Sequence, residues 1–391
     1  MEKVPAKLVK KLNAREASGN LRALRGQEDL VDFSSNDYLG FARNRGIASW
    51  ALQIQQDTQF VRNGSSGSRL LSGNHDLYVR LEEMLEQLHE APVLVFNSGY
   101  DANIGFFSCV PQRNDVVFYD EFAHASIRDG IRLGLAKSNK FRHNDLEDLE
   151  TQLARLKPDN KPSEKADREC YVATESVFSM DGDSPDLHAL VKLCDKFGCR
   201  LIVDEAHAIG VFAPGGVGLM QEMDLHRHAF ARILTFGKAM GVHGAAVAGN
   251  IMLKEYLINF ARSFIYSTAL PPHTIATLLA AYHYCVTESG EEKQQKLREN
   301  IEYFGQGLVT HGLTQYFMPG KSAIQSCLLP GNLRVRKVAG ALRNAGFDLR
   351  PILAPTVPEG KERLRFCLHS YNTRQQIDDV QNALSVLIKS T

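Results

Sequence analysis

The chain has 391 residues, of which 44% are hydrophobic and 23% are charged, as is typical of a globular enzyme with two or three sub-domains. Its 45 basic side chains balance 45 acidic ones, and the lack of a basic excess counts against a nucleic-acid partner. No apolar run is long enough to cross a bilayer and the N-terminal segment has no apolar signal region, so we expect a cytoplasmic protein without a membrane span. The seven cysteines lack zinc-type spacing, so we expect reduced thiols and no metal site.

The N-terminal part predicts an arm over residues 1–45. It contains one helix and then, in DLVDFSSNDYLG, a strand and a turn. The next clear signal is a helix over residues 76–90, because apolar side chains recur there at helical spacing. The residues on its apolar face are Leu77, Leu81, Met84, Leu85 and Leu88.

The middle of the chain alternates short apolar runs with amphipathic segments. One of these segments, residues 184–198, predicts a helix that ends at Gly198. Apolar runs linked by helices indicate an α/β fold with a mostly parallel sheet, in which ligands gather at the carboxyl ends of the strands. The expected strands lie within residues 92–99, 114–121, 169–176, 199–206 and 230–237, and each runs directly into polar or glycine residues.

The pattern changes near residue 270, where Pro271 and Pro272 interrupt the chain. A long helical stretch is expected over 273–309, followed by short strands and helices. The last helix begins with Thr373 and Gln376 at the spacing of a capping box. We therefore expect a large domain over 46–270 and a smaller C-terminal α/β domain over 271–391.

The segment LIVDEAHAIG, residues 201–210, contains the letters of a helicase acidic box. That interpretation requires an upstream phosphate loop of the form GxxxxGK[ST]. The only GKS, at residues 320–322, lies downstream of the box and has Gln315 where the first glycine belongs. A second Gly-Lys pair, Gly237 and Lys238, is followed by Ala239, which offers no hydroxyl for magnesium. A nucleoside triphosphatase is therefore disfavoured.

A different constellation follows the expected strands. Asp204 ends one strand, and His207 comes three residues later. Lys238 follows the next strand between Gly237 and Gly241, which are expected to allow close backbone approach. Pyridoxal phosphate needs a lysine for its aldehyde, a carboxylate for its ring nitrogen and a helix N-terminus for its phosphate. Further residues that suit this cofactor are Thr235, His124 and the turn NSGY at 97–100.

The chain resembles the α-oxoamine synthases, pyridoxal-phosphate enzymes of the aspartate-aminotransferase fold, fold type I. The resemblance covers nearly the whole length, and ESVFSMDGD together with TFGKAMGVHGAAV is its most specific part. The motifs that carry it are SSNDYLG (34–40), GSSGSRLLSGNH (64–75), NSGYDAN (97–103), HASIRDGIRL (124–133), ESVFSMDGD (175–183), VDEAHAIGVF (203–212), TFGKAMGVHGAAVAG (235–249), YSTALPP (266–272) and APTVPEGKERLR (354–365).

The resemblance implies a role for each matching residue around the cofactor. Lys238 would hold pyridoxal 5′-phosphate and act as acid and base at the substrate α-carbon, and Asp204 would pair with the pyridine nitrogen. His207 would donate to O3′, and His124 would stack on the ring. The residues expected near the phosphate and the cofactor rim are Gly99, Tyr100, Thr235 and Ser179. Ser267 and Thr268 would reach the phosphate of a neighbouring subunit, which implies a homodimer.

Four residues would face the substrate. Arg365 matches the arginine that holds the amino-acid carboxylate, although its alternation with apolar residues in RLRFCL also fits a charge on the surface of a strand. Asn36 and Arg22 match residues at the substrate entrance, and Thr356 belongs to the same side. Arg22 lies in a basic helical segment, where a solvated arginine is the ordinary interpretation.

Three positions depart from the family pattern, namely Ala208, His243 and Leu353, where glycine, serine and arginine are common. They leave Lys238 and Asp204 in place. The expected reaction is the decarboxylative condensation of L-alanine with a pimeloyl thioester, carried on CoA or an acyl carrier protein, in biotin synthesis. The alternatives are a synthase that uses glycine, serine or another small amino acid with a different thioester, and a plain aminotransferase or aldolase of the same fold.

Overall fold

The computed structural model describes residues 4–19, 21–22, 24, 26, 29–156 and 168–390. Its centre is a seven-stranded sheet with the order β2-β8-β7-β6-β5-β3-β4. Only β8 runs antiparallel to its neighbours, so the sheet is mostly parallel, as predicted. The strands are β2 (Val93–Phe96), β3 (Val116–Asp120), β4 (Lys137–Phe141), β5 (Cys170–Glu175), β6 (Arg200–Asp204), β7 (Ala231–Thr235) and β8 (Ala245–Gly249).

Five of these strands, β2, β3, β5, β6 and β7, confirm the predicted ones, and two were missed. The strand β4 has the sequence KSNKF, and its first four residues are exposed because it lies at the edge of the sheet. The strand β8 is buried but consists mainly of alanine and glycine, which have low strand propensity. In both cases the sheet position, rather than the local sequence, determines the strand.

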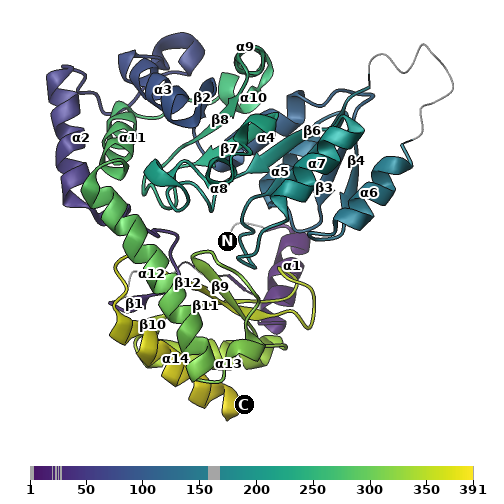
Figure 1. Cartoon of the computed structure of the whole chain (residues 1–391), viewed down its shortest axis with the longest axis vertical. Helices are drawn as coiled ribbons and strands as arrows, with labels where there is room; N and C mark the ends of the chain where they lie inside the picture. Colours follow the sequence, from purple (N-terminus) through teal and green to yellow (C-terminus); the bar gives the residue numbers. More distant parts are fainter. Residues whose placement is uncertain are drawn as a thin grey trace.

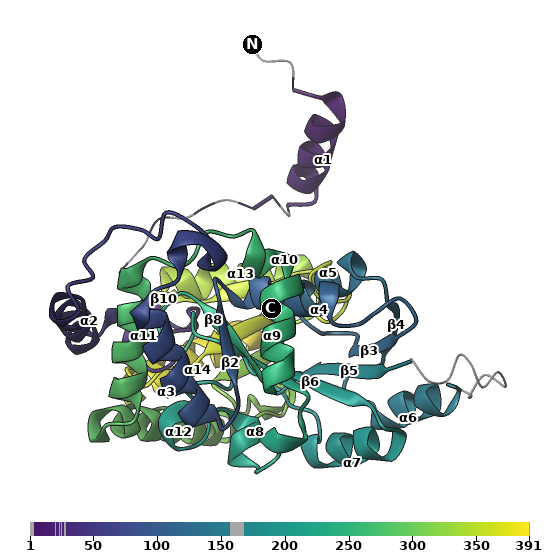
Figure 2. The same cartoon turned by 90° about the horizontal axis from the view of Figure 1, so that it is seen from above.

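Helices cover both faces of the sheet (Figures 1 and 2). Along β6, Leu201 and Val203 pack into one apolar cluster with α6 and α7, while Ile202 packs into another with α4 and α5. The alternation follows from the period of two along a strand. The helices of this part are α2 (Arg45–Asp57), α3 (Asp76–His89), α4 (Gly99–Cys109), α5 (Ala125–Leu133), α6 (Leu146–Ala154), α7 (Leu187–Phe197), α8 (Leu219–Glu222), α9 (Ile251–Phe260) and α10 (Arg262–Ile265).

Two of these helices confirm sequence predictions in detail. In α3, Leu77, Leu81 and Leu85 are buried, so the predicted apolar face is the one that packs against the core. The helix α7 ends at Gly198, whose φ of 67° is the left-handed conformation that a glycine adopts without strain.

The C-terminal part forms a second layer below the large sheet in Figure 1. It contains an antiparallel sheet with the order β11-β12-β9, whose strands are β9 (Ile324–Leu328), β11 (Arg350–Ile352) and β12 (Arg363–Cys367). The short strand β1 (Val31–Asp32) pairs with β10 (Phe347–Asp348), which ties the N-terminal segment to this layer. The helices of this layer are α12 (Glu288–Thr310), α13 (Asn332–Asn344) and α14 (Arg374–Lys389), whereas α11 (Pro272–Cys285) packs against α2 and α3.

The long helical stretch predicted over 273–309 is confirmed, and it consists of two helices. The chain breaks between α11 and α12, where the side chain of Thr287 caps α12 by accepting a hydrogen bond from the backbone N–H of Gly290 at 3.3 Å. The predicted capping box is confirmed, since Thr373 and Gln376 bond each other's backbone at the start of α14.

The first helix, α1 (Ala6–Ala17), stands away from the rest of the chain in Figure 2 and buries none of its residues. The division into an arm, a large domain and a small domain, with boundaries at 45 and 270, stays our proposal. Among the described residues, no helix has the length and apolarity needed to cross a membrane.

Candidate functional site

The site forms where the parallel strands end and polar side chains follow. Glu175 and Asp204 end the neighbouring strands β5 and β6 and are paired in register. Thr235 ends β7, and Lys238 follows three residues later in the turn that leads to β8. The fold therefore brings together two carboxylates, a hydroxyl and an amine from three adjacent strands.

Asp204 is buried, and each of its carboxylate oxygens accepts one hydrogen bond. The Asn103 side chain donates to Oδ2 at 2.8 Å, and the backbone N–H of Ala206 donates to Oδ1 at 3.0 Å. The Asn103 amide also donates to Ser126 Oγ at 3.0 Å, and that hydroxyl lies 2.7 Å from His124 Nδ1. A polar network thus joins Asp204 to His124, the residue that caps α5.

Lys238 begins a chain of hydrogen bonds that ends at Arg365. Its Nζ lies 2.7 Å from His207 Nε2, and His207 Nδ1 lies 2.7 Å from the hydroxyl of Tyr38. The Tyr38 hydroxyl donates to Asn36 Oδ1 at 3.2 Å, and Arg365 donates to the same oxygen at 3.0 Å.

The surroundings of His207 determine its charge. Its two ring nitrogens contact Tyr38 and Lys238, and in a neutral imidazole one nitrogen donates and the other accepts. Burial and the positive charge of Lys238 lower the pKa of His207 well below its ordinary value, so the imidazole is neutral at pH 7. A neutral His207 therefore has one N–H that it can donate.

Lys238 changes its charge close to neutral pH. Desolvation lowers the pKa of Lys238 to about 8, although the carboxylates of Asp204 and Glu175 oppose this shift. The Glu175 carboxylate is buried and accepts from the backbone N–H of His124 at 2.7 Å. Burial and the nearby Asp204 raise the pKa of Glu175 to about 8. An amine with a pKa near 8 can exchange a proton at physiological pH.

An unsatisfied hydroxyl marks the place where an anion would fit. Thr235 Oγ1 is buried and has no hydrogen-bond partner within the described part of the chain. It lies against Gly99, where a Cβ atom would collide with it, at the start of α4. A helix N-terminus with a glycine and a free hydroxyl fits the phosphate of pyridoxal phosphate. Tyr100 is half-exposed, and its hydroxyl donates to Asp129 at 2.7 Å.

The two residues expected to reach a neighbouring subunit lie beside the same turn within one chain. The Thr268 carbonyl oxygen accepts from the side chain of Asn97, two residues before Gly99, at 2.7 Å. Ser267 precedes it and is partly buried. Their reach into a partner's site stays a prediction.

A pocket of about 420 Å³ opens next to His124 and contains two more of the expected residues, Ser179 and Thr356. They come from the segment after β5 and from the segment between β11 and β12, so the pocket lies between the two sheets of the fold. Arg22 is not brought to this group; it is exposed in the segment after α1. Among the described residues, no group of His, Cys, Asp or Glu side chains has the arrangement of a metal site.

Of the two glycines around Lys238, only Gly241 allows the close backbone approach that was predicted. It has a φ of 68°, and a Cβ atom there would collide with the backbone of Phe41 and Ala42. A Cβ atom on Gly237 would meet no atom within 4 Å, so the prediction is wrong for that position.

The three residues that depart from the family pattern take no part in the hydrogen bonds that join Asp204 to His124 or Lys238 to Arg365. Ala208 is fully buried, and His243 is exposed. Leu353 packs against the main apolar core, and its carbonyl oxygen accepts from the backbone N–H of Thr356 at 2.8 Å. Leu353 therefore supports the segment that carries a pocket residue.

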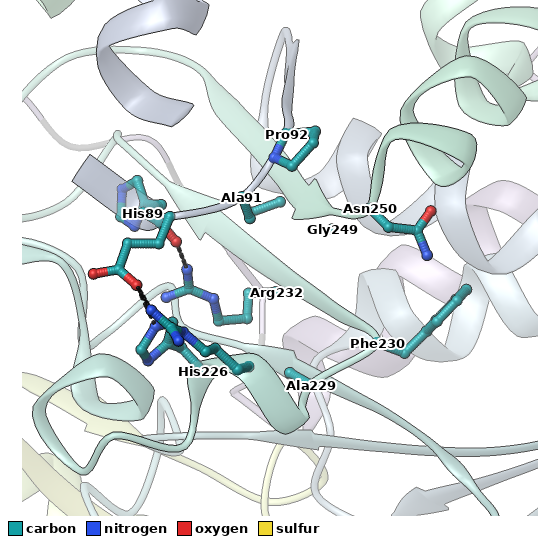
Figure 3. Close-up of a pocket in the computed structure, with 12 residues that line it drawn as sticks. His89, Ala91, Pro92, His226, Ala229, Phe230, Arg232, Gly249 and Asn250 are labelled. Atoms are coloured by element: carbon teal, nitrogen blue, oxygen red, sulfur yellow. Dashed lines mark hydrogen bonds and ion pairs between the residues drawn. The ribbon is translucent and has the colours of Figure 1, made fainter. Parts of the chain in front are cut away.

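A second pocket, of about 370 Å³, lies at the opposite edge of the large sheet (Figure 3). It is lined by residues just before β2 and β7 and at the end of the antiparallel strand β8. Its buried cation, Arg232, pairs with Glu205 at 3.4 Å and donates to the carbonyl oxygen of His89 at 2.7 Å. This guanidinium is already bound within the chain, and the pocket is separate from the Lys238 network.

Four residues that contact the candidate site residues were not predicted from the sequence: Asn103, Ser126, Tyr38 and Glu175. All four lie inside quoted motifs, in NSGYDAN, HASIRDGIRL, SSNDYLG and ESVFSMDGD. The sequence feature that could have indicated them is a polar side chain next to an expected strand end or helix start. What singles them out is their contacts, which join residues up to 169 positions apart.

Comparison with known proteins gives concordant results. The model of the family "aminotransferase class I and II" matches residues 28–384. An 8-amino-7-oxononanoate synthase from Emericella nidulans is 39% identical over 369 residues, which cover 92% of this chain and 89% of the relative.

Two solved structures extend the comparison to the fold. A serine palmitoyltransferase from S. paucimobilis, with PLP and myriocin bound, superposes with a TM-score of 0.88 at 25% identity and covers 100% of this chain and 99% of its own. The 8-amino-7-oxononanoate synthase from Francisella tularensis gives 0.76 at 28% identity and covers 93% and 99%. The predicted fold type I architecture is thereby confirmed. The chain belongs to the aminotransferase class I and II family, and within that family to the α-oxoamine synthases.

Proposed function

We propose that this chain is a pyridoxal-phosphate-dependent 8-amino-7-oxononanoate synthase. It joins L-alanine to a pimeloyl thioester, and carbon dioxide and the free thiol are released. The observation that carries the proposal is the placement of Lys238 within 2.7 Å of His207, in the field of the carboxylates Asp204 and Glu175. The relative from Emericella nidulans bears the name of this activity, which supports the choice within the family.

Pyridoxal phosphate supplies a protonated pyridine ring that delocalises negative charge from the substrate α-carbon. Lys238 holds its aldehyde, Asp204 its ring nitrogen and His207 its O3′, while His124 covers the ring face. The Thr235 hydroxyl, Gly99 and the backbone at Tyr100 hold the phosphate, and Ser179 lies near the opposite rim. These roles fit the free hydroxyl of Thr235 and the hydrogen-bonded carboxylate of Asp204.

The proton chemistry is assigned to Lys238. With a pKa near 8, its amine takes a proton from the α-carbon of alanine and returns one after decarboxylation. His207 lies 2.7 Å from the Lys238 amine and keeps it oriented. Arg365 holds the alanine carboxylate. The binding of one substrate by groups from both sheets excludes water from the site.

A homodimer completes the proposed site, with Ser267 and Thr268 of each chain next to the cofactor phosphate of the other. The helix α1 supports this assembly, since it buries no residue within one chain and leaves Leu8 and Leu12 about half exposed. Apolar side chains on an isolated helix face favour burial against a partner.

One alternative within the family is a synthase that condenses serine with a longer acyl thioester. The close superposition on the serine palmitoyltransferase favours it, whereas the higher identity to the Emericella nidulans relative favours alanine and pimeloyl. An amino-acid-dependent assay of free thiol separates the two. We expect pimeloyl-CoA to release CoA with L-alanine and at least about tenfold more slowly with glycine, serine or cysteine, because an extra polar group or a missing methyl fits the pocket less well. Release with serine and none with alanine would overturn the biotin-pathway assignment.

Arg365 provides a test of substrate anchoring. A bidentate guanidinium matches a carboxylate better than an ammonium, and Arg365 Nε is buried without a partner among the described residues. We expect Arg365→Leu to raise the apparent Kd for L-alanine by one to two orders of magnitude, since a charged hydrogen bond contributes about 1.5–3 kcal/mol. Arg365→Lys should recover part of this loss. Spectral titration of the cofactor-loaded enzyme with alanine measures both values.

The control is Arg350→Leu. Arg350 is the cross-strand neighbour of Arg365 on β11, is exposed, and pairs with Asp348 at 3.3 Å. The Arg350→Leu variant should bind alanine as the wild type does. If Arg365→Leu also left the affinity unchanged, Arg365 would be a strand surface charge and Asn36 or His124 would hold the carboxylate.

A further inference from the structure

The pocket beside His124 has walls that suit a hydrocarbon chain. Phe122, Phe178, Met180 and Val357 are among its lining residues, and they come from three separate segments of the chain. Apolar side chains of this kind bind an acyl chain through the burial of its methylene groups. Its lining includes His124 but none of the residues from Lys238 to Arg365 that are joined by hydrogen bonds.

Four charged side chains also line this pocket, and three of them lie close to a side chain of opposite charge. Arg363 and Asp181 form a buried ion pair. Glu121 lies 4.0 Å from Lys140 and accepts from the backbone N–H of His143 at 3.2 Å. The fourth, Arg128, has no side-chain hydrogen bond or ion pair within the described ranges.

The position of Arg128 follows from the helix that carries it. Arg128 is an exposed residue in the first turn of α5, four residues after the N-cap His124, and both residues line the pocket. His124 joins the pocket to the Asp204 network through Ser126. Arg128 therefore lines the same pocket as a residue that hydrogen bonds connect to Asp204.

We propose that Arg128 binds a free carboxylate at the far end of the acyl donor, and so selects a dicarboxylic acyl thioester over a monocarboxylic one. The proposal rests on the function proposed above and names a residue that determines the specificity of that site for its acyl donor. A carboxylate placed among apolar side chains needs a cation, and a guanidinium provides two parallel donors for it. A monocarboxylic chain would end in a methyl group and leave Arg128 without that partner.

The test compares pimeloyl-CoA with heptanoyl-CoA, which has the same chain length without the terminal carboxylate. The enzyme is cofactor-loaded and supplied with L-alanine, and kcat/KM is measured from CoA release. We expect Arg128→Gln to lower kcat/KM for pimeloyl-CoA about tenfold, as suits a charged hydrogen bond open to solvent, and to leave the value for heptanoyl-CoA unchanged. Arg128→Lys should lose less.

The matched control is Arg132→Gln. Arg132 lies one turn further along α5, is strongly exposed and faces Asp129 at 3.4 Å. The Arg132→Gln variant should keep the wild-type preference for pimeloyl-CoA. An equal loss with both thioesters in Arg128→Gln would assign Arg128 to the CoA part of the substrate and overturn the proposal. No loss with either thioester would overturn it as well.

A failure of the proposed function gives a different result. In that case the wild-type enzyme would release CoA from neither thioester with L-alanine. Calorimetric binding of pimeloyl-CoA and heptanoyl-CoA to the loaded wild type and to Arg128→Gln would then still decide the role of Arg128. Tighter binding of pimeloyl-CoA that is lost in the variant supports the role, and equal binding contradicts it.

Discussion

Lys238→Ala should abolish turnover and remove the covalent attachment of pyridoxal phosphate. The lost proton transfer alone costs about 10²–10⁴-fold in rate, and the loss of the attachment point adds to it. After borohydride reduction, mass spectrometry should find the cofactor on the peptide that contains Lys238 in the wild type. It should find none in the variant.

A second variant separates the chemistry of the amine from its charge. Lys238→Arg keeps a positive charge near Asp204 and Glu175 but cannot attach the aldehyde, so it should be as inactive as Lys238→Ala. Only the neutral amine attacks the aldehyde, and the pKa of Lys238 lies at about 8. We therefore expect the rate of cofactor attachment to the wild type to rise with pH up to about 8 and then to level off. Turnover or attachment in Lys238→Ala would contradict the assignment.

Asp204→Asn should bind pyridoxal phosphate but lose most exchange of the alanine α-proton with solvent. An adjacent carboxylate raises the pKa of a protonated ring nitrogen by about 1–3 units, so its removal should slow exchange by about 10- to 1000-fold. Proton exchange in deuterated water, followed by nuclear magnetic resonance of alanine, measures this step without the acyl donor. Exchange at the wild-type rate would exclude the proposed role.

The structural cost of this substitution needs its own control. Asn103 and the backbone N–H of Ala206 donate to different oxygens of Asp204, and in Asn an NH2 group replaces one of these two acceptors. Asp115 is also a buried carboxylate, and it accepts from two backbone N–H groups, those of Gln112 at 2.6 Å and Glu169 at 2.9 Å. It lies at the opposite edge of the sheet, just before β3. Asp115→Asn should therefore have a similar stability loss and normal proton exchange.

Much of the fold could be predicted because its local signals are strong. The strands β3 and β6 contain the buried apolar runs VVF and LIV, and the end of α7 is fixed by Gly198. The edge strand β4 could not be predicted, since KSNKF becomes a strand only by pairing with β3. The break between α11 and α12 depends on the single capping residue Thr287, which lies inside an otherwise helical pattern.

The candidate site could be predicted where a residue directly follows a strand. Asp204 and Lys238 were predicted in this way, and each begins one of the two sets of hydrogen bonds at the site. Tyr38 and Asn103 were not found, because their contacts with His207 and Asp204 join residues 169 and 101 positions apart. Their importance arises from tertiary contacts, which a single sequence does not contain.

The most direct test of the central claim uses L-alanine labelled in its carboxyl group, with pimeloyl-CoA as the acyl donor. For a decarboxylative condensation, we expect one labelled carbon dioxide for each CoA released, together with a product of the mass of 8-amino-7-oxononanoate. The formation of pyruvate from alanine, or the release of CoA without labelled carbon dioxide, would contradict it.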